Sequence, residues 1–325
     1  GNIVKGVKIK NKRTGEVDTF YAPVTVNAGG IWGQGIAQMA GAGITMFPAK
    51  GSLLIFGHRV NNVVINRCRK PANADILVPG ETISLIGTTS DRVGLEEVDK
   101  LRVTPEEVKV LLEEGQKLSP VLAQTRIIRA YCGVRPLVAA DNDPSGRNIS
   151  RGIVLLDHDT RDGIGGFITI TGGKLMTYRL MAEWATDLVC KKLDIRRGCV
   201  TARRPLPGSA PEERAASANE DKCGSLICEC EKVSLHKAEN AIDNLQVTNM
   251  IDLRRRTRLG MGTCQGELCA CRGAGLIARK KENPTRAKED LKTFMNERWK
   301  GICPICWGDS LRENEYTQWI YTHEI

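Results

Sequence analysis

The sequence has few aromatic residues, no uninterrupted apolar run of membrane length and no internal repeat. Phe, Trp and Tyr make up 5% of its 325 residues, and no basic stretch is interleaved with stacking rings, which argues against a single-strand nucleic-acid binder. The uncharged stretch 22–49 contains Asn27, Gln34, Gln38 and several glycines, so it predicts a buried strand and helix, not a membrane span. The first residues lack the apolar core of a signal peptide.

The overall composition is that of a folded protein. Apolar residues make up 41% and charged residues 26%, and 325 residues are enough for two or more domains. The net charge of +9 would suit nucleic acid, an anionic membrane surface or phosphate-bearing substrates, and it selects none of them. Basic runs such as 253–258 are typical of a solvated face.

Cysteine is abundant, with twelve residues and no signal peptide to indicate an oxidising compartment. The thiols are therefore expected to serve metal binding, redox chemistry or packing. Four are scattered along the first two hundred residues, whereas the other eight lie between 223 and 306. A dedicated cysteine unit is the prediction.

Local patterns predict a mixed α and β chain. Residues 2–30 alternate apolar and polar positions around a turn at "KRTG", which indicates a hairpin and a further strand ending in glycines. Thr104, Pro105 and two glutamates mark the start of a helix ending near 118. Residues 152–173 read as another hairpin and 174–193 as a long amphipathic helix.

The expected organisation has four parts. Residues 1–193 form the main domain, and 194–222 are polar, proline-bearing and without periodicity, as in a linker. A compact cysteine unit follows over 223–282. The remaining residues, 283–325, are expected to form a mostly helical tail.

The cysteine unit contains the pattern C-x-C-x33-C-x4-C, formed by Cys228, Cys230, Cys264 and Cys269. Four thiolates in two close pairs can bind a zinc ion or a [2Fe–2S] cluster. Structural zinc usually takes ligands two to four residues apart, so the one-residue gap favours the cluster. Glycines around Cys264 would also free backbone N–H groups to point at sulfur. The pattern resembles the bacterioferritin-associated-ferredoxin type of [2Fe–2S] domain.

Other thiols leave alternatives open. Cys271 and Cys223 are near enough in sequence to replace one of the four. Cys303 and Cys306 form a C-x-x-C that suits a redox dithiol or half of a metal site, but it stands alone in the tail, which favours an ordinary pair of thiols.

The first two hundred residues contain two stretches suited to a flat, anionic cofactor. The segment "VTVNAGGIW", 24–32, is a strand ending in small residues, which lets a backbone approach a ring closely. In "ITITGGKLMTYRLMAEW", 168–184, a strand, Gly172, Gly173, Lys174 and a helix start place N–H groups and a cation at one point.

Together with "FPAKGSLLI", "LIGTTS" and "YCGVRPLVAADNDPSGRNISRG", these stretches resemble the later part of the FAD-dependent glycerol-3-phosphate dehydrogenases. The cysteine unit and "ERWKGICPICWGDSLRE" resemble the large catalytic A-type chains of the anaerobic form. The resemblance covers almost the whole chain. It implies an α/β (α+β) fold of the glycine/D-amino-acid oxidase type with a small helical [2Fe–2S] domain.

The resemblance also assigns residues. Arg135 in "GVRPL", Arg151 in "SRG" and Lys174 would contact the substrate, and Arg and Lys side chains suit a phosphate dianion. The positions expected along the FAD are Ala28, Gly29, Gly172, Gly173, Lys174 and Thr177.

The implied activity is oxidation of sn-glycerol 3-phosphate to dihydroxyacetone phosphate. FAD accepts the hydride, and electrons pass through the cluster and small B- and C-type partner subunits to membrane quinone, in anaerobic respiration on glycerol. The chain itself is expected to be peripheral, on the cytoplasmic face of the inner membrane, and not to bind nucleic acid.

The sequence departs from the family pattern at several points. The dinucleotide fingerprint G-x-G-x-x-G is absent, so the chain is expected to be a fragment that begins after the FAD phosphate site. The linker also looks shorter than in the family. A histidine of cluster-free relatives is replaced by Leu53, which leaves the catalytic base unassigned; His58 and His158 are nearby histidines with a more ordinary structural interpretation.

Two other functions fit the same residues. One is an amino-acid-oxidising flavoprotein with the same cluster domain, acting on proline or hydroxyproline. The other is a basic zinc-binding interaction module, which would be colourless, whereas an iron–sulfur protein absorbs visible light.

Overall fold

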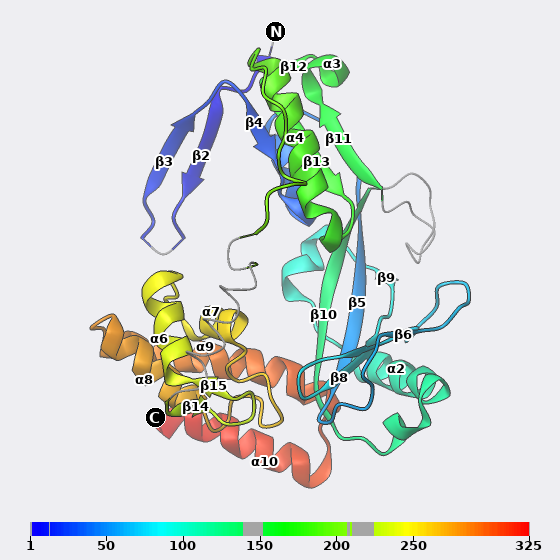
Figure 1. The fold of residues 1–325 in the computed structure, drawn as a ribbon, viewed down its shortest axis with the longest axis vertical. Helices are drawn as coiled ribbons and strands as arrows, with labels where there is room; N and C mark the ends of the chain where they lie inside the picture. Colours follow the sequence, from blue (N-terminus) through cyan, green and yellow to red (C-terminus); the bar gives the residue numbers. More distant parts are fainter. Residues whose placement is uncertain (1, 13, 139–151, 207–208, 210–223, 325) are drawn as a thin grey trace. The chain divides into compact units, whose positions relative to one another are not determined.

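The structure is a computed structural model that describes residues 2–12, 14–138, 152–206, 209 and 224–324 (Figure 1). By internal contacts the chain divides into two units that interleave in sequence. Unit 1 comprises Gly1–Lys50, Ser90–Lys100 and Val134–Pro207. Unit 2 comprises Gly51–Thr89, Leu101–Gly133 and Gly208–Ile325.

Unit 1 is built on a three-stranded sheet. The strand order is β11 (Ile153–Asp157), β13 (Phe167–Gly172) and β4 (Thr25–Asn27). Strand β13 is antiparallel to β11 and parallel to β4. Its residues are almost all buried, as expected of a β-branched central strand. A short helix, α3 (His158–Asp162), interrupts the hairpin predicted for 152–173.

Helices and short strands complete unit 1. Helix α1 (Gly33–Met39) follows β4, and α4 (Tyr178–Lys192) follows β13. Strands β2 (Gly6–Lys10) and β3 (Val17–Tyr21) form the predicted antiparallel hairpin. The remaining pair, which is parallel, consists of β1 (Asn2–Ile3) and β12 (Ile164–Gly165).

A six-stranded sheet contains the two longest strands of the described chain, β5 (Met46–Phe56) and β10 (Ile127–Val138), each with residues of both units. Strand β5 is buried along nearly its full length. The strands that complete the sheet are β6 (Ile65–Asn66), β7 (Ile76–Pro79), β8 (Ser84–Gly87) and β9 (Asp91–Arg92).

Helix α2 (Pro105–Leu118) begins where the sequence predicts. The Thr104 side chain accepts a hydrogen bond from the Glu107 amide, and the Glu107 carboxylate accepts one from the Thr104 amide. This reciprocal cap satisfies two N–H groups that a helix start leaves free. The helix buries Val108 and Leu111 in one core with the strands of unit 2.

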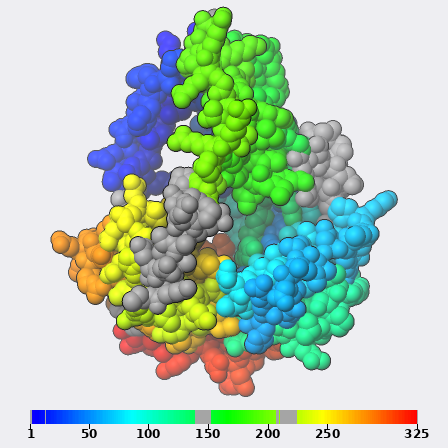
Figure 2. Space-filling view, viewed as in Figure 1, coloured from blue at the N-terminus to red at the C-terminus, as the bar shows by residue number. Residues whose placement is uncertain are grey.

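The cysteine region and the tail share one core. The core residues come from β14 (Leu226–Cys228), β15 (Val233–Ser234), α6 (Leu235–Asn244), α7 (Met250–Thr257), α8 (Ala270–Lys280) and α9 (Pro284–Ile302). Helix α10 (Gly308–Trp319) follows and has no buried residue. Leu291, Phe294 and Met295 of α9 are buried in the same cluster as Cys228 and Cys269. Figure 2 shows the surfaces of α6 and the segment 51–89 in yellow and light blue within this unit.

Besides α3, the structure departs from the sequence prediction in two places. Strands β5 and β10 are not predicted as strands. Strand β5 is buried at nearly every position, so it lacks the alternation that indicates a strand, and it contains Pro48 and Gly51. Helix α4 begins at Tyr178, and a 3₁₀ turn, Leu175–Thr177, separates it from Lys174. Among the helices of the described residues, none has both the length and the apolar character to cross a membrane.

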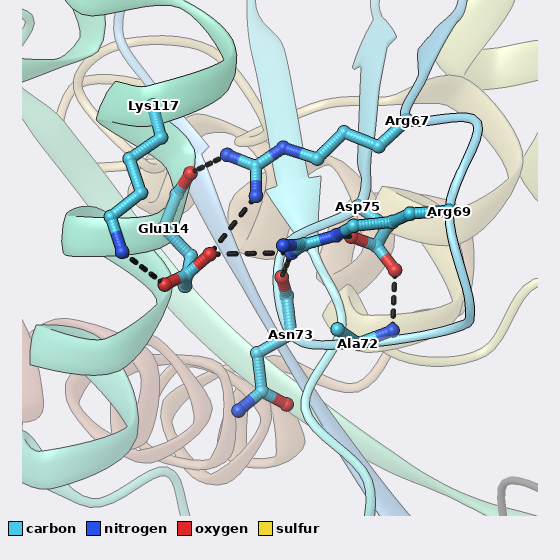
Figure 3. Close-up of polar contacts among 7 residues, drawn as sticks. All are labelled: Arg67, Arg69, Ala72, Asn73, Asp75, Glu114 and Lys117. Atoms are coloured by element: carbon cyan, nitrogen blue, oxygen red, sulfur yellow. Dashed lines mark hydrogen bonds and ion pairs between the residues drawn. The ribbon is translucent and has the colours of Figure 1, made fainter.

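An ion-pair network attaches the loop between β6 and β7 to α2 (Figure 3). The Glu114 carboxylate lies 2.9 Å from Arg67 Nη1, 3.2 Å from Arg69 Nη2 and 2.5 Å from Lys117 Nζ. Arg69 also pairs with Asp75, at 2.8 Å. Hydrogen bonds from Lys117 and then Arg67 hold the pKa of Glu114 at about 2.

Replacing Glu114 with glutamine should therefore destabilise the protein by about 1–2 kcal/mol at pH 7, because a charge-assisted network of partly exposed groups is lost. The folded-state pKa is depressed, so the stabilisation is complete above the unfolded value near 4.5 and fades as the pH falls toward 2. Urea unfolding at pH 7 and pH 3 measures this.

Glu113→Gln is the matched control, since the Glu113 side chain is 58% exposed and its carboxylate lies 3.9 Å from Lys109 Nζ. Its effect should stay below about 0.5 kcal/mol. Equal effects of the two substitutions, or a Glu114→Gln effect that does not shrink in acid, would contradict this interpretation.

Candidate functional site

A cavity of about 490 Å³ in unit 1 is lined mainly by small and apolar residues of β4, β13 and α4. Ala28, Gly30 and Gly172 lie at its edge with Pro136 of β10. Gly30 has a φ of +56°, and a Cβ there would meet open space. A flat ring could approach the backbone closely at this point, so the residues fit a flavin ring.

The Gly172–Gly173 turn is held tightly. Both residues have left-handed φ values, +73° and +69°, and the Gly173 amide donates to the Gly152 carbonyl at 2.9 Å. A Cβ on Gly172 would lie 2.5 Å from that same carbonyl oxygen. Only glycine fits here, and the turn brings β13 to the cavity.

The other predicted cofactor residues do not line the cavity. The Gly29 amide donates to Asn27 Oδ1 at 3.1 Å, which fixes the end of β4. Thr177 Oγ1 accepts from the Lys174 amide at 2.9 Å and closes the turn before α4. The Lys174 side chain is exposed to solvent.

Arg135 is half-buried in β10, and its Nη1 lies 3.4 Å from the carbonyl oxygen of Lys50 on β5. Lys50 itself is 7% exposed, which is unusual for a lysine. The sequence prediction missed Lys50; a lysine within the apolar run 46–56 was the available signal. Arg151 lies outside the described residues.

The histidines near these segments differ in environment. His158 is fully buried; its Nδ1 lies 2.5 Å from Asp162 Oδ2 and its Nε2 2.8 Å from Thr169 Oγ1. Both ring nitrogens are thus engaged inside unit 1, as in a structural histidine. His58 is exposed, and Leu53 pairs with Gly87 of β8.

The four predicted cluster cysteines come together in unit 2. Cys230 Sγ lies 3.6 Å from Cys264 Sγ, and the Cys269 thiol donates a hydrogen bond to Cys228. The contacts thus join one cysteine of C-x-C to one of C-x4-C. A Cβ on Gly262 would lie 2.4 Å from Cys230 Cβ, so this glycine permits the loop's close approach.

The environment of the Cys228 sulfur favours its thiolate form. Hydrogen bonds from Cys269 and from the Gly260 and Glu231 amides lower the pKa of Cys228 to about 6, against the effect of burial. The same thiol–thiol bond, together with burial, raises the pKa of Cys269. Within the described residues no three such ligands converge as a single-ion site; the sulfurs instead form two pairs.

The remaining thiols lie apart from these contacts. Cys271 is half-buried on α8, and its hydrogen-bond partner is Tyr321. Cys303 is exposed and Cys306 half-buried, and Cys306 Sγ lies 3.6 Å from both Ser310 Oγ and Asn314 Nδ2. Cys223 lies outside the described residues.

Comparison with known proteins identifies both parts of the chain. Residues 1–179 match the family described as FAD dependent oxidoreductase. The chain belongs to this FAD-dependent oxidoreductase family. Residues 226–279 match the BFD-like [2Fe–2S] binding domain. The expected mixed fold and both expected cofactor classes, FAD and a [2Fe–2S] cluster, are confirmed at the level of these families.

The relatives of this oxidoreductase chain include the A subunits of anaerobic glycerol-3-phosphate dehydrogenases. That of Escherichia coli K12 is 59% identical over 99% of this chain and 64% of its own length. That of Haemophilus influenzae is 55% identical over 99% and 62%, and the A1 subunit of Haloferax volcanii is 36% identical over 92% and 55%. The predicted resemblance is confirmed, and the chain spans a little under two thirds of these first two relatives.

A solved structure agrees on the fold. The glycerol-3-phosphate dehydrogenase of Bacillus halodurans, complexed with FAD, superposes with a TM-score of 0.66 at 21% identity, over 94% of this chain and 67% of that one. At this identity the similarity concerns the fold alone.

Gly172→Ala should unfold unit 1 at clearly lower urea concentration than the wild type. The left-handed φ costs a non-glycine residue about 1–2 kcal/mol, and the clash with Gly152 adds about 1–3 kcal/mol.

Gly163→Ala is the control, because Gly163 has a similar φ of +68° but a Cβ there would meet nothing within 4 Å. Gly163→Ala should lose only the stability that a left-handed φ costs a non-glycine residue. Equal losses of stability in the two variants would refute a tight approach at Gly172.

Proposed function

We propose that this chain is the catalytic part of a quinone-linked, anaerobic-type glycerol-3-phosphate dehydrogenase. It oxidises sn-glycerol 3-phosphate to dihydroxyacetone phosphate. The observation that carries the proposal is 59% identity to the E. coli protein over 99% of the chain, together with matches to both an FAD oxidoreductase family and a [2Fe–2S] domain. Residues 1–193 would form the FAD and substrate domain and 223–282 the cluster domain, joined by the linker 194–222 and followed by the tail 283–325.

Binding of the substrate phosphate is assigned to cations of unit 1. Arg135 is half-buried and Lys50 is buried, so each charge is partly desolvated and would attract a dianion strongly. Arg151 and Lys174 complete the proposed set. Bound FAD supplies the hydride acceptor. The small residues Ala28, Gly29, Gly172 and Gly173, with Thr177, would admit its ring and exclude water from the reacting carbon.

The four cysteines Cys228, Cys230, Cys264 and Cys269 are the proposed cluster ligands. Their meeting in two sulfur pairs, with amides directed at Cys228, supports a binuclear site over a single tetrahedral ion. The cluster would carry single electrons between substrate oxidation and the next acceptor.

The proposed acceptors are small B- and C-type subunits that lead to membrane quinone. The E. coli relative bears the letter A among the subunits of its enzyme, which suggests that the enzyme has several different chains. The present chain would be peripheral on the cytoplasmic face of the inner membrane and act in anaerobic glycerol metabolism.

Cys264→Ser should lower the iron and sulfide content of anaerobically prepared protein and weaken its visible absorbance, because one thiolate ligand is lost. Cys271→Ser is the control: its thiol bonds Tyr321, and iron content should stay at the wild-type level. If Cys271→Ser loses iron and Cys264→Ser keeps it, the proposed ligand set is wrong.

Arg135→Met should weaken binding of glycerol 3-phosphate about tenfold or more, since a charge-assisted hydrogen bond contributes about 1.5–3 kcal/mol. Titration calorimetry or a ligand-induced shift of the melting temperature measures this without bound flavin. Arg197→Met, which removes an exposed arginine of unit 1, is the control and should bind normally.

With FAD supplied, turnover should occur with glycerol 3-phosphate and not with proline or hydroxyproline. Turnover with the amino acids alone would transfer the activity to an amino-acid-oxidising flavoprotein.

A further inference from the structure

Three arginines lie inside unit 2 with hydrogen-bonding atoms left over. Arg129 of β10 is 9% exposed and Arg298 of α9 is 2% exposed, while Arg254 of α7 is half-buried. Among the described residues, no hydrogen-bond acceptor is found for Arg129 Nη1, Arg254 Nε, Arg298 Nε and Arg298 Nη1, all of which are buried atoms. Buried guanidinium groups normally find acceptors, so these four N–H positions call for an explanation.

The contacts that these arginines do make fix their positions. Arg129 Nη2 donates to the Glu297 carbonyl at 3.0 Å, and a Cβ on Gly301 would lie 2.8 Å from Arg129 Nε, so α9 packs directly on Arg129. Arg298 Nη2 donates to Asn314 Oδ1 at 2.8 Å.

Arg254 is held by weaker contacts. Its Nη2 lies 3.4 Å from Gln265 Oε1, within the loop between Cys264 and Cys269, and its guanidinium carbon lies 5.9 Å from the centre of the Phe294 ring. Tertiary packing therefore holds all three guanidinium groups in the interior.

The three charges act on one another. Burial, and then the charge of Arg129, lowers the pKa of Arg254 to about 9. Burial also lowers the pKa of Arg129, and the charge of Arg298 adds to that effect. Guanidinium groups keep their proton at neutral pH, so all three side chains are cations there. Three like charges held near one another in the interior are costly unless negative charge balances them.

Carboxylates supply only part of this balance. Glu267 lies 3.6 Å from Arg298 but is 46% exposed, and Glu297 is 47% exposed and lies 3.9 Å from Lys300. The cluster cysteines lie close to two of the arginines. Arg298 and Cys264 line one cavity, and Arg254 contacts Gln265, the residue after Cys264. As cluster ligands these sulfurs would carry negative charge.

We propose that Arg129, Arg254 and Arg298 form the internal counter-charge of the [2Fe–2S] site and hold its reduction potential up. This inference rests on the proposed cluster ligands. When the site gains one electron its negative charge rises by one, so fixed positive charge in a water-poor interior stabilises the reduced form more than the oxidised form. The three arginines are positioning residues for charge and do not ligate iron.

The three arginines come from three different parts of the chain, and only one of them lies in the matched [2Fe–2S] domain. Arg254 lies within residues 226–279, whereas Arg129 comes from the oxidoreductase portion and Arg298 from the tail. The potential of the cluster would thus depend on β10 and α9, which explains why α9 shares a core with the cysteine region.

The test is a redox titration of the full chain, reconstituted anaerobically, with dithionite as electron donor and the reduced cluster followed by electron paramagnetic resonance. Arg298→Met should lower the midpoint potential, so that the reduced fraction at a fixed potential falls about tenfold or more, which is ~59 mV for a one-electron couple. Arg254→Met should shift it in the same direction. Arg298→Lys keeps the charge and should restore most of the wild-type potential.

Arg312→Met is the control, because it removes one positive charge from a side chain that is 80% exposed on α10. It should leave the potential unchanged. Iron and sulfide are measured on every sample: their absence from the wild type refutes the cluster assignment itself and this inference with it. Normal iron content with equal potentials in Arg298→Met, Arg254→Met and the control refutes this inference alone.

A diffusible anion is the competing occupant, since a cavity of about 540 Å³ is lined by Arg129 and Arg254 as well as Arg255 and Arg258. Inorganic phosphate is the probe. If phosphate raises the melting temperature of the wild type, Arg254→Met abolishes that rise and the potential of Arg254→Met stays at the wild-type value, the arginines hold a free anion and the inference is wrong.

Discussion

The interior of unit 2 depends on a balance of charge. Four thiols and three guanidinium groups lie in or beside one core, and the buried positive charge is unfavourable unless negative charge balances it. Neutral thiols would leave the arginines short of negative partners, and thiolates without the arginines would repel one another in a poorly solvated place. The buried residues of α9 pack in the same core as Cys228 and Cys269, and Arg298 lies on this helix. The tail is therefore part of the cluster's environment and not an appendage to it.

Unit 1 shows a different constraint, the close approach of one backbone segment to another. The ends of β4 and β13 carry small residues, and the Gly172–Gly173 turn is locked by the Gly152 carbonyl. The Arg135 side chain contacts the carbonyl of the buried Lys50 on β5. The family match supplies the cofactor that such a surface would serve.

Local signals in the sequence were sufficient wherever local chemistry decides the structure. Thr104, Pro105 and Glu107 predicted the start of α2 to the residue, and the spacing of the cysteines selected four thiols that the structure brings together. Tertiary packing decides the rest. Strand β5 is buried on both faces, so it has no alternation to detect, and Lys50 is unusual only for its burial.

The burial of Arg254 also could not be predicted from the sequence. Residues 253–258 look like a solvated basic run, but Arg254 turns inward because α9 and the loop after Cys264 cover it. The joining of one cysteine from each pair could not be predicted from spacing either, since it depends on how the loop at Gly262 meets Cys230. Charge burial and sulfur pairing arise from contacts between distant segments.

Metal and sulfide analysis of the wild-type chain, purified without oxygen, tests the central claim most directly. The account predicts about two iron ions and about two inorganic sulfide ions per chain, with red-brown absorbance that dithionite bleaches. A colourless protein with about one zinc ion per chain and no sulfide would contradict it.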